Sequence, residues 1–134
     1  PKHLEKALAI GLLRRLGDTT FEQPSPRLAA VAAELRDLGI PTDTALQTAA
    51  KLRRNAENVA RDYVELFLEQ VWRPFEDAGR PPDRWPEVRQ ALDRLRPLAT
   101  ESLTAMFGIV MSEAVEEAFG KELERSKRGS RKRK

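Results

Sequence analysis

The stretch ALQTAAKLRRNAENVARDYVELFLEQVWRPF, residues 45–75, decides the fold of this chain. Apolar residues recur along it at alternating spacings of four and three, at Ala45, Ala49, Leu52, Ala56, Val59, Tyr63 and Leu66. This period is typical of a long helix that packs lengthwise against other helices. At about 1.5 Å per residue, the predicted helix is roughly 45 Å long.

A second apolar stripe runs beside the first one, at Ala60, Val64, Phe67, Val71 and Phe75. A helix that is apolar over two adjacent stripes has more surface to bury than one neighbouring helix can cover. Two interpretations follow: a central helix of one bundle, or a helix that also contacts a second subunit. For the second, we predict a homodimer whose candidate interface is Ala49, Leu52, Ala56, Val59 and Leu66.

The residues before this helix predict two shorter helices and a small strand pair. Leucines four residues apart indicate a helix over 4–16, which Gly17 would end. The β-favouring residues that follow predict a wing-like strand pair near residues 18–23. Ser25 is a suitable N-cap and Pro26 a suitable first residue for a helix that runs to about Leu38.

Prolines divide the second half of the chain. Pro74 should kink the long helix or end it early, and the helix should end near Ala78–Gly79. After a proline-rich loop, a final helical region runs from Pro86 to about Leu123, where Pro97 should bend or divide it. The predicted fold is all-α: a helical bundle with two long antiparallel helices and the small strand pair.

Composition limits the classes of protein to which the chain could belong. Its 134 residues are the size of one domain, which we place at residues 1–124. Cysteine is absent, which excludes a disulfide framework and cysteine-ligated zinc and fits a reducing compartment. No apolar run approaches the 18 residues of a membrane span. We therefore expect a cytoplasmic protein that does not enter a membrane.

Charge is unevenly distributed, although the net charge is only +3. The last ten residues hold seven basic residues and no acidic ones: Arg125, Lys127, Arg128, Arg131, Lys132, Arg133 and Lys134. The sequence predicts a disordered tail here, because so charged a segment cannot bury apolar surface. The tail could neutralise DNA phosphates without reading sequence, or only keep the protein soluble.

Catalytic residues are poorly represented. The single histidine, His3, lies near the terminus, and the pairs Glu65–Glu69 and Glu113–Glu117 have the spacing of a solvated helix face. No glycine-rich phosphate loop and no Glu-x-x-His pair is present. We predict a protein that is not an enzyme and uses neither a metal nor a cofactor.

Aromatic residues offer a candidate ligand pocket. If the two long helices are antiparallel, Trp72, Phe75 and Trp85 gather at one end of the bundle. Such a wall suits a small apolar effector, but it could equally be a packed aromatic core that closes the bundle. The candidate pocket residues are Tyr63, Phe67, Trp72, Phe75, Trp85 and Phe107.

Four strings, taken in order, resemble the C-terminal region of actinobacterial MerR-family transcriptional regulators. They are PSPRL (24–28), ELRDLGIPTDTAL (34–46), ARDYVELFLEQVWRPFEDAGRPPDRWPEV (60–88) and ALDRLRPLA (91–99). The resemblance extends from about Ala7 to Leu123. It implies an all-helical regulatory domain that follows an N-terminal winged helix–turn–helix, which is not in this sequence. Contact with DNA would be made mainly by that absent part.

Two functions are therefore expected. The first is a C-terminal domain that senses an effector, mediates dimerisation, or both, in a bacterial DNA-binding transcription regulator. Because the chain has no cysteine, the thiol-based metal sensors of the family are not a match. The alternative is a non-enzymatic helical protein that binds DNA non-specifically through its basic C-terminal tail.

Overall fold

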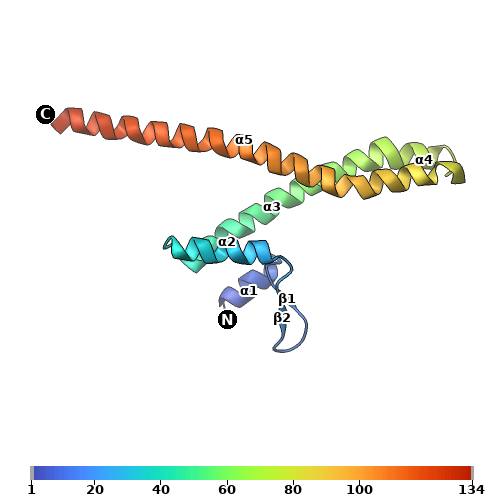
Figure 1. Cartoon of the computed structure of the whole chain (residues 1–134), viewed down its shortest axis with the longest axis horizontal. Helices are drawn as coiled ribbons and strands as arrows, with labels where there is room; N and C mark the ends of the chain where they lie inside the picture. Colours follow the sequence, from blue (N-terminus) through green and yellow to red (C-terminus); the bar gives the residue numbers. More distant parts are fainter. Residues whose placement is uncertain (1, 134) are drawn as a thin grey trace. The chain divides into compact units, whose positions relative to one another are not determined.

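The computed structural model describes residues 2–133, with side chains over residues 2–129. The fold is all-α with one small antiparallel sheet, as the sequence predicted (Figure 1). The chain divides into two compact units, Pro1–Val59 and Ala60–Lys134, while the single domain expected over residues 1–124 stays a prediction. The long helix α3 (Thr42–Phe67) contributes residues to both.

The first unit begins with α1 (Lys2–Ala9), followed by strands β1 (Arg14–Arg15) and β2 (Phe21–Glu22). The strands pair antiparallel, with Arg15 opposite Phe21, so the predicted strand pair is present. The first helix, however, ends at Ala9, well before the predicted stop at Gly17. Gly11 ends it, with φ +80°, while the Leu12 N–H donates to the Ala7 carbonyl. This is a Schellman-type end, which favours glycine.

Helix α2 (Pro26–Asp37) has the predicted boundaries to within one residue. The Ser25 hydroxyl accepts a hydrogen bond from the Leu28 N–H at 3.3 Å, and Pro26 opens the helix. The chain then turns at Gly39, whose φ is +87°. The capping prediction is therefore confirmed.

Helix α1 is attached to the start of α3. Ala7 and Leu46 are the buried apolar residues of the first unit among those described. Asp43 Oδ1 lies 2.9 Å from His3 Nε2 and 3.3 Å from Lys6 Nζ. Arg53 Nη1 donates to the Ile10 carbonyl at 3.1 Å, which holds the end of α1 on the third turn of α3.

In the second unit, the helical path passes through a π-helical turn, η1 (Leu68–Trp72), into α4 (Arg73–Asp77). Pro74 explains this change, because it has no N–H to donate to the carbonyl four residues earlier. One residue before it, the Arg73 N–H bonds to the Leu68 carbonyl, five residues back. The chain turns at Gly79, as predicted. At Pro74, where a kink or an early end was expected, the structure shows a change of helix type.

A 3₁₀ turn, η2 (Pro82–Arg84), leads into α5 (Trp85–Arg133). Figure 1 shows α4 and the start of α5 side by side and antiparallel. Phe75 and Val88 are the buried apolar residues of this hairpin among those described.

Helix α5 differs from prediction in two respects. It is not divided at Pro97, since a proline removes only one hydrogen bond and both flanks are strong helix formers. It also remains helical to Arg133, whereas a disordered tail was expected from Arg125; Lys134 lies outside the described residues. Extending an existing helix by one residue costs little free energy compared with starting a new one. Glu122 also pairs with Arg125 at 3.6 Å.

By length and composition alone, α5 could also cross a membrane, which the sequence did not lead us to expect. One 18-residue window within Pro82–Gly129 reaches a mean hydropathy of 1.2. The uncharged run inside it extends only from Ser102 to Ser112. At about 1.5 Å per residue, this run covers roughly 17 Å, about half of a hydrocarbon core.

Candidate functional site

Three of the six candidate aromatic residues meet at the end of the α4–α5 hairpin. The rings of Trp72 and Phe75 have centroids 5.7 Å apart, and those of Phe75 and Trp85 are 6.0 Å apart. Both pairs are tilted, by 49° and 43°, and both centroid separations lie in the range that aromatic pairs prefer. The guanidinium of Arg80 lies 5.5 Å from the centre of the Trp72 ring and also bonds Glu76 at 2.9 Å.

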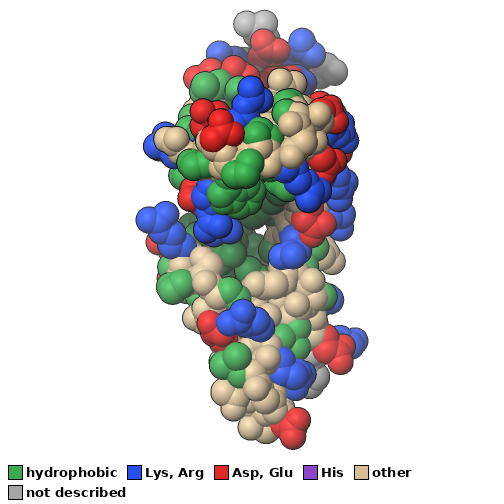
Figure 2. Space-filling view, turned by 90° about the vertical axis from the view of Figure 1, so that its right-hand side faces the viewer, with side chains coloured by type: hydrophobic (Ala, Val, Ile, Leu, Met, Phe, Trp, Pro, Cys, Tyr) green, Lys and Arg blue, Asp and Glu red, His purple; other side chains and the backbone are tan. Residues whose placement is uncertain are grey.

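This cluster is packed rather than hollow. Phe75 is only 6% exposed and sits between the two tryptophans, while Trp85 remains 45% exposed. Figure 2 looks at the end of the molecule where α4 turns into α5, and hydrophobic side chains reach the surface there among charged ones. The arrangement supports the interpretation of an aromatic core that closes the hairpin.

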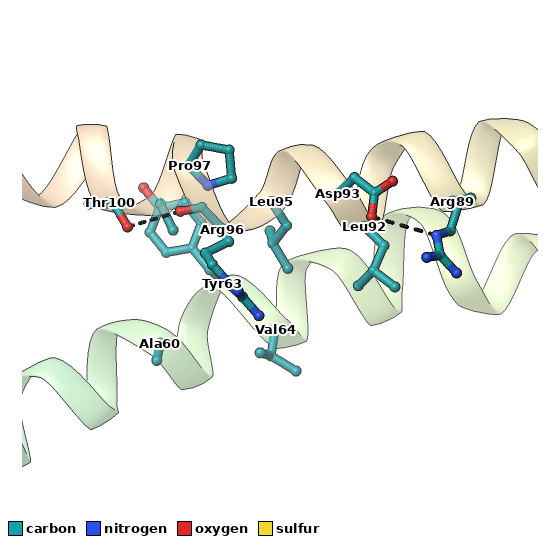
Figure 3. A pocket seen from close by; sticks show the side chains of 11 residues that line it. Ala60, Tyr63, Val64, Arg89, Leu92, Asp93, Leu95, Arg96, Pro97 and Thr100 are labelled. Atoms are coloured by element: carbon teal, nitrogen blue, oxygen red, sulfur yellow. Dashed lines mark hydrogen bonds and ion pairs between the residues drawn. The ribbon is translucent and has the colours of Figure 1, made fainter. Parts of the chain in front are cut away.

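An open groove of about 680 Å³ lies further along the same unit, between the last turns of α3 and residues 89–100 near the start of α5. Figure 3 shows Ala60, Tyr63 and Val64 on one side and α5 on the other. The α5 side is formed by Arg89, Leu92, Asp93, Leu95, Arg96, Pro97, Ala99 and Thr100. Small side chains at Ala60 and Ala99, one on each helix, leave the space empty.

The groove has an apolar floor and a polar rim. Arg89 Nε lies 3.6 Å from Asp93 Oδ1, and Thr100 Oγ1 donates to the Arg96 carbonyl at 3.0 Å (Figure 3). Both members of the Arg89–Asp93 pair are more than 60% exposed, so it adds little stability. With two arginines and one aspartate, the rim has a net charge of +1. It could hold an apolar body with a negatively charged or polar end.

The other aromatic candidates lie apart from the cluster. Tyr63 lines the groove, Phe67 is half-buried at the end of α3, and Phe107 is 56% exposed on α5. Sequence reasoning did not single out Arg89, Asp93 or Arg96 as rim residues. The available signal was the pair of alanines, Ala60 and Ala99, which occupy core positions in the apolar pattern of both helices.

The predicted interface residues on α3 are unevenly exposed. Ala49 and Val59 are half-buried, Ala56 is exposed, and Leu52 and Leu66 are 53% and 52% exposed. A larger set of exposed apolar side chains lies on α5, beyond the groove.

Basic residues of the C-terminal segment lie on the surface of α5. The side chains of Arg125, Lys127 and Arg128 are exposed. The backbone of Arg131, Lys132 and Arg133 belongs to α5, and Lys134 lies outside the described residues. Over residues 2–129, no group of three or more His, Cys, Asp or Glu residues is placed to hold a metal ion.

Comparison with known proteins leaves the function to be argued from this geometry. No family model matches the chain, and no curated protein or solved structure is significantly similar to it.

Proposed function

We propose that this chain is a non-enzymatic regulatory and self-association domain of a cytoplasmic bacterial transcription regulator of the MerR type. The observation that carries the proposal is the amount of uncovered surface. The chain exposes 11461 Å². Two separate compact units, each of half its 15.2 kDa mass, would together expose roughly 8,600 Å².

The excess surface is rich in apolar side chains, which favours a protein partner. Large apolar residues more than 45% exposed occur on α2, α3 and α5, among them Val31, Leu52 and Phe107. Where such side chains gather on one element, as they do on α5, they mark an interaction site. In a two-fold dimer, two attached DNA-binding domains would match the symmetry of a palindromic operator.

An effector in the groove would give this dimer a regulatory input. A ligand wedged between Ala60 and Ala99 would favour one separation of α3 and α5 over another. Because α3 continues without interruption from this unit into the other, its position can influence residues before Val59. A ligand that binds one arrangement more tightly shifts the population toward it, which is the physical content of allosteric control.

The dimer part of the proposal is tested by sedimentation equilibrium at moderate salt, over about a hundredfold range of concentration. We expect a monomer–dimer equilibrium or a stable dimer. A monomer throughout this range would contradict the self-association function.

The groove is tested separately with 1-anilinonaphthalene-8-sulfonate, which has an apolar body and one negative charge. We expect saturable binding that is lost in Ala60→Leu, where the larger side chain fills the groove. Ala30→Leu is the matched control, because Ala30 is exposed on α2. Equal binding by both variants would exclude the groove as the site.

The second candidate function, non-specific DNA binding, is favoured by the exposed Arg125, Lys127 and Arg128. If all seven basic residues of the segment contact phosphates, log Kd should change with log salt by a slope of about 6. Removing residues 125–134 should abolish this binding. Sequence-selective binding by the truncated chain would contradict this function.

A further inference from the structure

Beyond the groove, one segment of α5 presents an unusual amount of apolar surface. Between residues 103 and 123, nine large apolar side chains are 40% to 64% exposed: Leu103, Met106, Phe107, Ile109, Val110, Met111, Val115, Phe119 and Leu123. Every residue from 101 to 129 is exposed. The segment is helical throughout, so its shape is set before any partner arrives.

The nine side chains project from all around the helix, but three of them, Leu103, Phe107 and Val110, fall on one line together with Thr100 and Ala114. Thr100, Leu103, Phe107, Val110 and Ala114 follow one another at spacings of three, four, three and four. We call the side of α5 that they form the α5 seam. A seam with this period is typical of helices that pack side by side. Ile109 lies on the opposite side of the helix, since at 100° per residue it is turned by about 160° from Phe107.

A lipid bilayer fits this segment poorly. Its uncharged run, Ser102–Ser112, is about 17 Å long, against a hydrocarbon core of about 30 Å. Glu101 precedes the run, and Glu113, Glu116 and Glu117 follow it within two turns. A helix spanning the bilayer would place several of these carboxylates in hydrocarbon, at a cost of about 2.5–3.5 kcal/mol for each one near the centre.

A second copy of this chain has enough surface to cover the segment. The chain exposes about 2,900 Å² more than two compact units would, and a standard interface buries a total of 1,200–2,000 Å² from both partners. The segment lies far along α5 from the hairpin, so nothing described in the chain covers it. An isologous contact uses the same surface twice and requires no other protein.

The order of charges along α5 selects the direction of pairing. Residues 113–124 contain five glutamates and one lysine, and residues 125–134 contain seven basic residues. A parallel, in-register pair would align each block with its own copy, and like charges repel. In an antiparallel pair centred on Ser102–Ser112, the acidic block of each copy instead runs beside residues 90–101 of the other, where Arg94 and Arg96 balance Asp93 and Glu101, so the two acidic blocks no longer face each other.

We propose that α5 pairs antiparallel with α5 of a second copy, through the α5 seam, with Ser102–Ser112 at the centre. This inference rests on the proposed self-association function and deepens it, since it names the occupant, the surface and the orientation. It replaces α3 with α5 as the main subunit contact.

Charge substitutions at matched exposure test the surface. Phe107 and Ile109 are both 56% exposed but lie on opposite sides of α5. Phe107→Glu should weaken dimerisation more than a hundredfold in sedimentation equilibrium, whereas Ile109→Glu should change it less than tenfold. Leu52→Glu on α3 should also leave the dimer intact. Circular dichroism at 222 nm checks that each variant remains helical.

Spin labels test the direction of pairing. The chain has no cysteine, so Ile109→Cys and Lys127→Cys each give one label, and the two positions are five helical turns apart on the same side of α5. In the proposed dimer, labels at 109 should lie within about 25 Å of each other and labels at 127 about 60 Å apart along the axis. A parallel pair would give the same short distance at both positions.

The outcomes separate this inference from the proposed function. A dimer that resists Phe107→Glu but is broken by Leu52→Glu, or one with equal short distances at both labels, overturns the α5 pairing while self-association stands. A monomer at all concentrations overturns both. A monomer that floats with vesicles of phosphatidylethanolamine and phosphatidylglycerol overturns both and shows that the apolar surface of α5 binds a membrane.

Discussion

Asp43 shows how single residues hold the first unit together. Lys6 and His3 of α1 both lie beside its carboxylate. The hydrogen bond and charge of Lys6 lower the pKa of Asp43 below the usual 3.8, and the charge and hydrogen bond of His3 add a smaller effect in the same direction. Because the pKa is lowered in the folded state, the stabilisation is present above pH 3.8 and is lost as the pH falls through the folded value.

Asp43→Asn should therefore reduce stability at pH 7, and the difference from the parent chain should shrink as the pH falls below 3.8 through the lowered pKa of Asp43. Thermal unfolding followed by circular dichroism at several pH values measures it. Asp62→Asn, an exposed change on the same helix, is the control and should have little effect. A difference that persists unchanged at pH 2.5 would exclude the charge interaction as its cause.

Phe75 is the residue on which the hairpin of the second unit depends. It is 6% exposed and packs between Trp72 and Trp85, so Phe75→Ala should cost about 3–5 kcal/mol. Urea unfolding followed by tryptophan fluorescence reports directly on this cluster. Leu38→Ala, at a side chain 77% exposed on the surface, should stay within about 0.5 kcal/mol. Similar losses in both variants would mean that the cluster is not a core.

At the scale of the element, α5 tolerates Pro97 in its interior. The proline leaves the Asp93 carbonyl without its usual helical partner, and an interior proline is about 3 kcal/mol less favourable than alanine. Pro97→Ala should raise the free energy of unfolding by up to this amount and increase the signal at 222 nm. An unchanged or lower stability would show that Pro97 does not destabilise α5.

At the scale of the whole molecule, stability should depend on protein concentration. Few of the described residues are buried within either unit, so in the proposed dimer the partner would supply much of the stabilising burial. The Tm measured by calorimetry should rise by several degrees over a hundredfold increase in concentration. Phe107→Glu should have a concentration-independent Tm. If the Tm of the parent chain is also independent of concentration, the units are stable as monomers.

The sequence by itself determined the elements. Period-four and period-three apolar spacing predicted the long helices, Ser25 and Pro26 located the start of α2, and Gly79 located the turn after α4. These features depend on neighbouring residues, so local chemistry is sufficient to predict them. Gly17 was predicted to end the first helix, but the left-handed residue that follows α1 is Gly11, next to the Ile10 carbonyl that Arg53 binds.

Only the tertiary structure decided which apolar residues are buried. Phe75 and Phe107 belong to similar helical patterns, yet one is 6% and the other 56% exposed. Periodicity shows that a residue faces some neighbour, but it does not show whether that neighbour lies in the same chain. The groove likewise depends on Ala60 and Ala99, from two different helices, lining the same space, and the uncovered length of α5 depends on how far the hairpin extends along it.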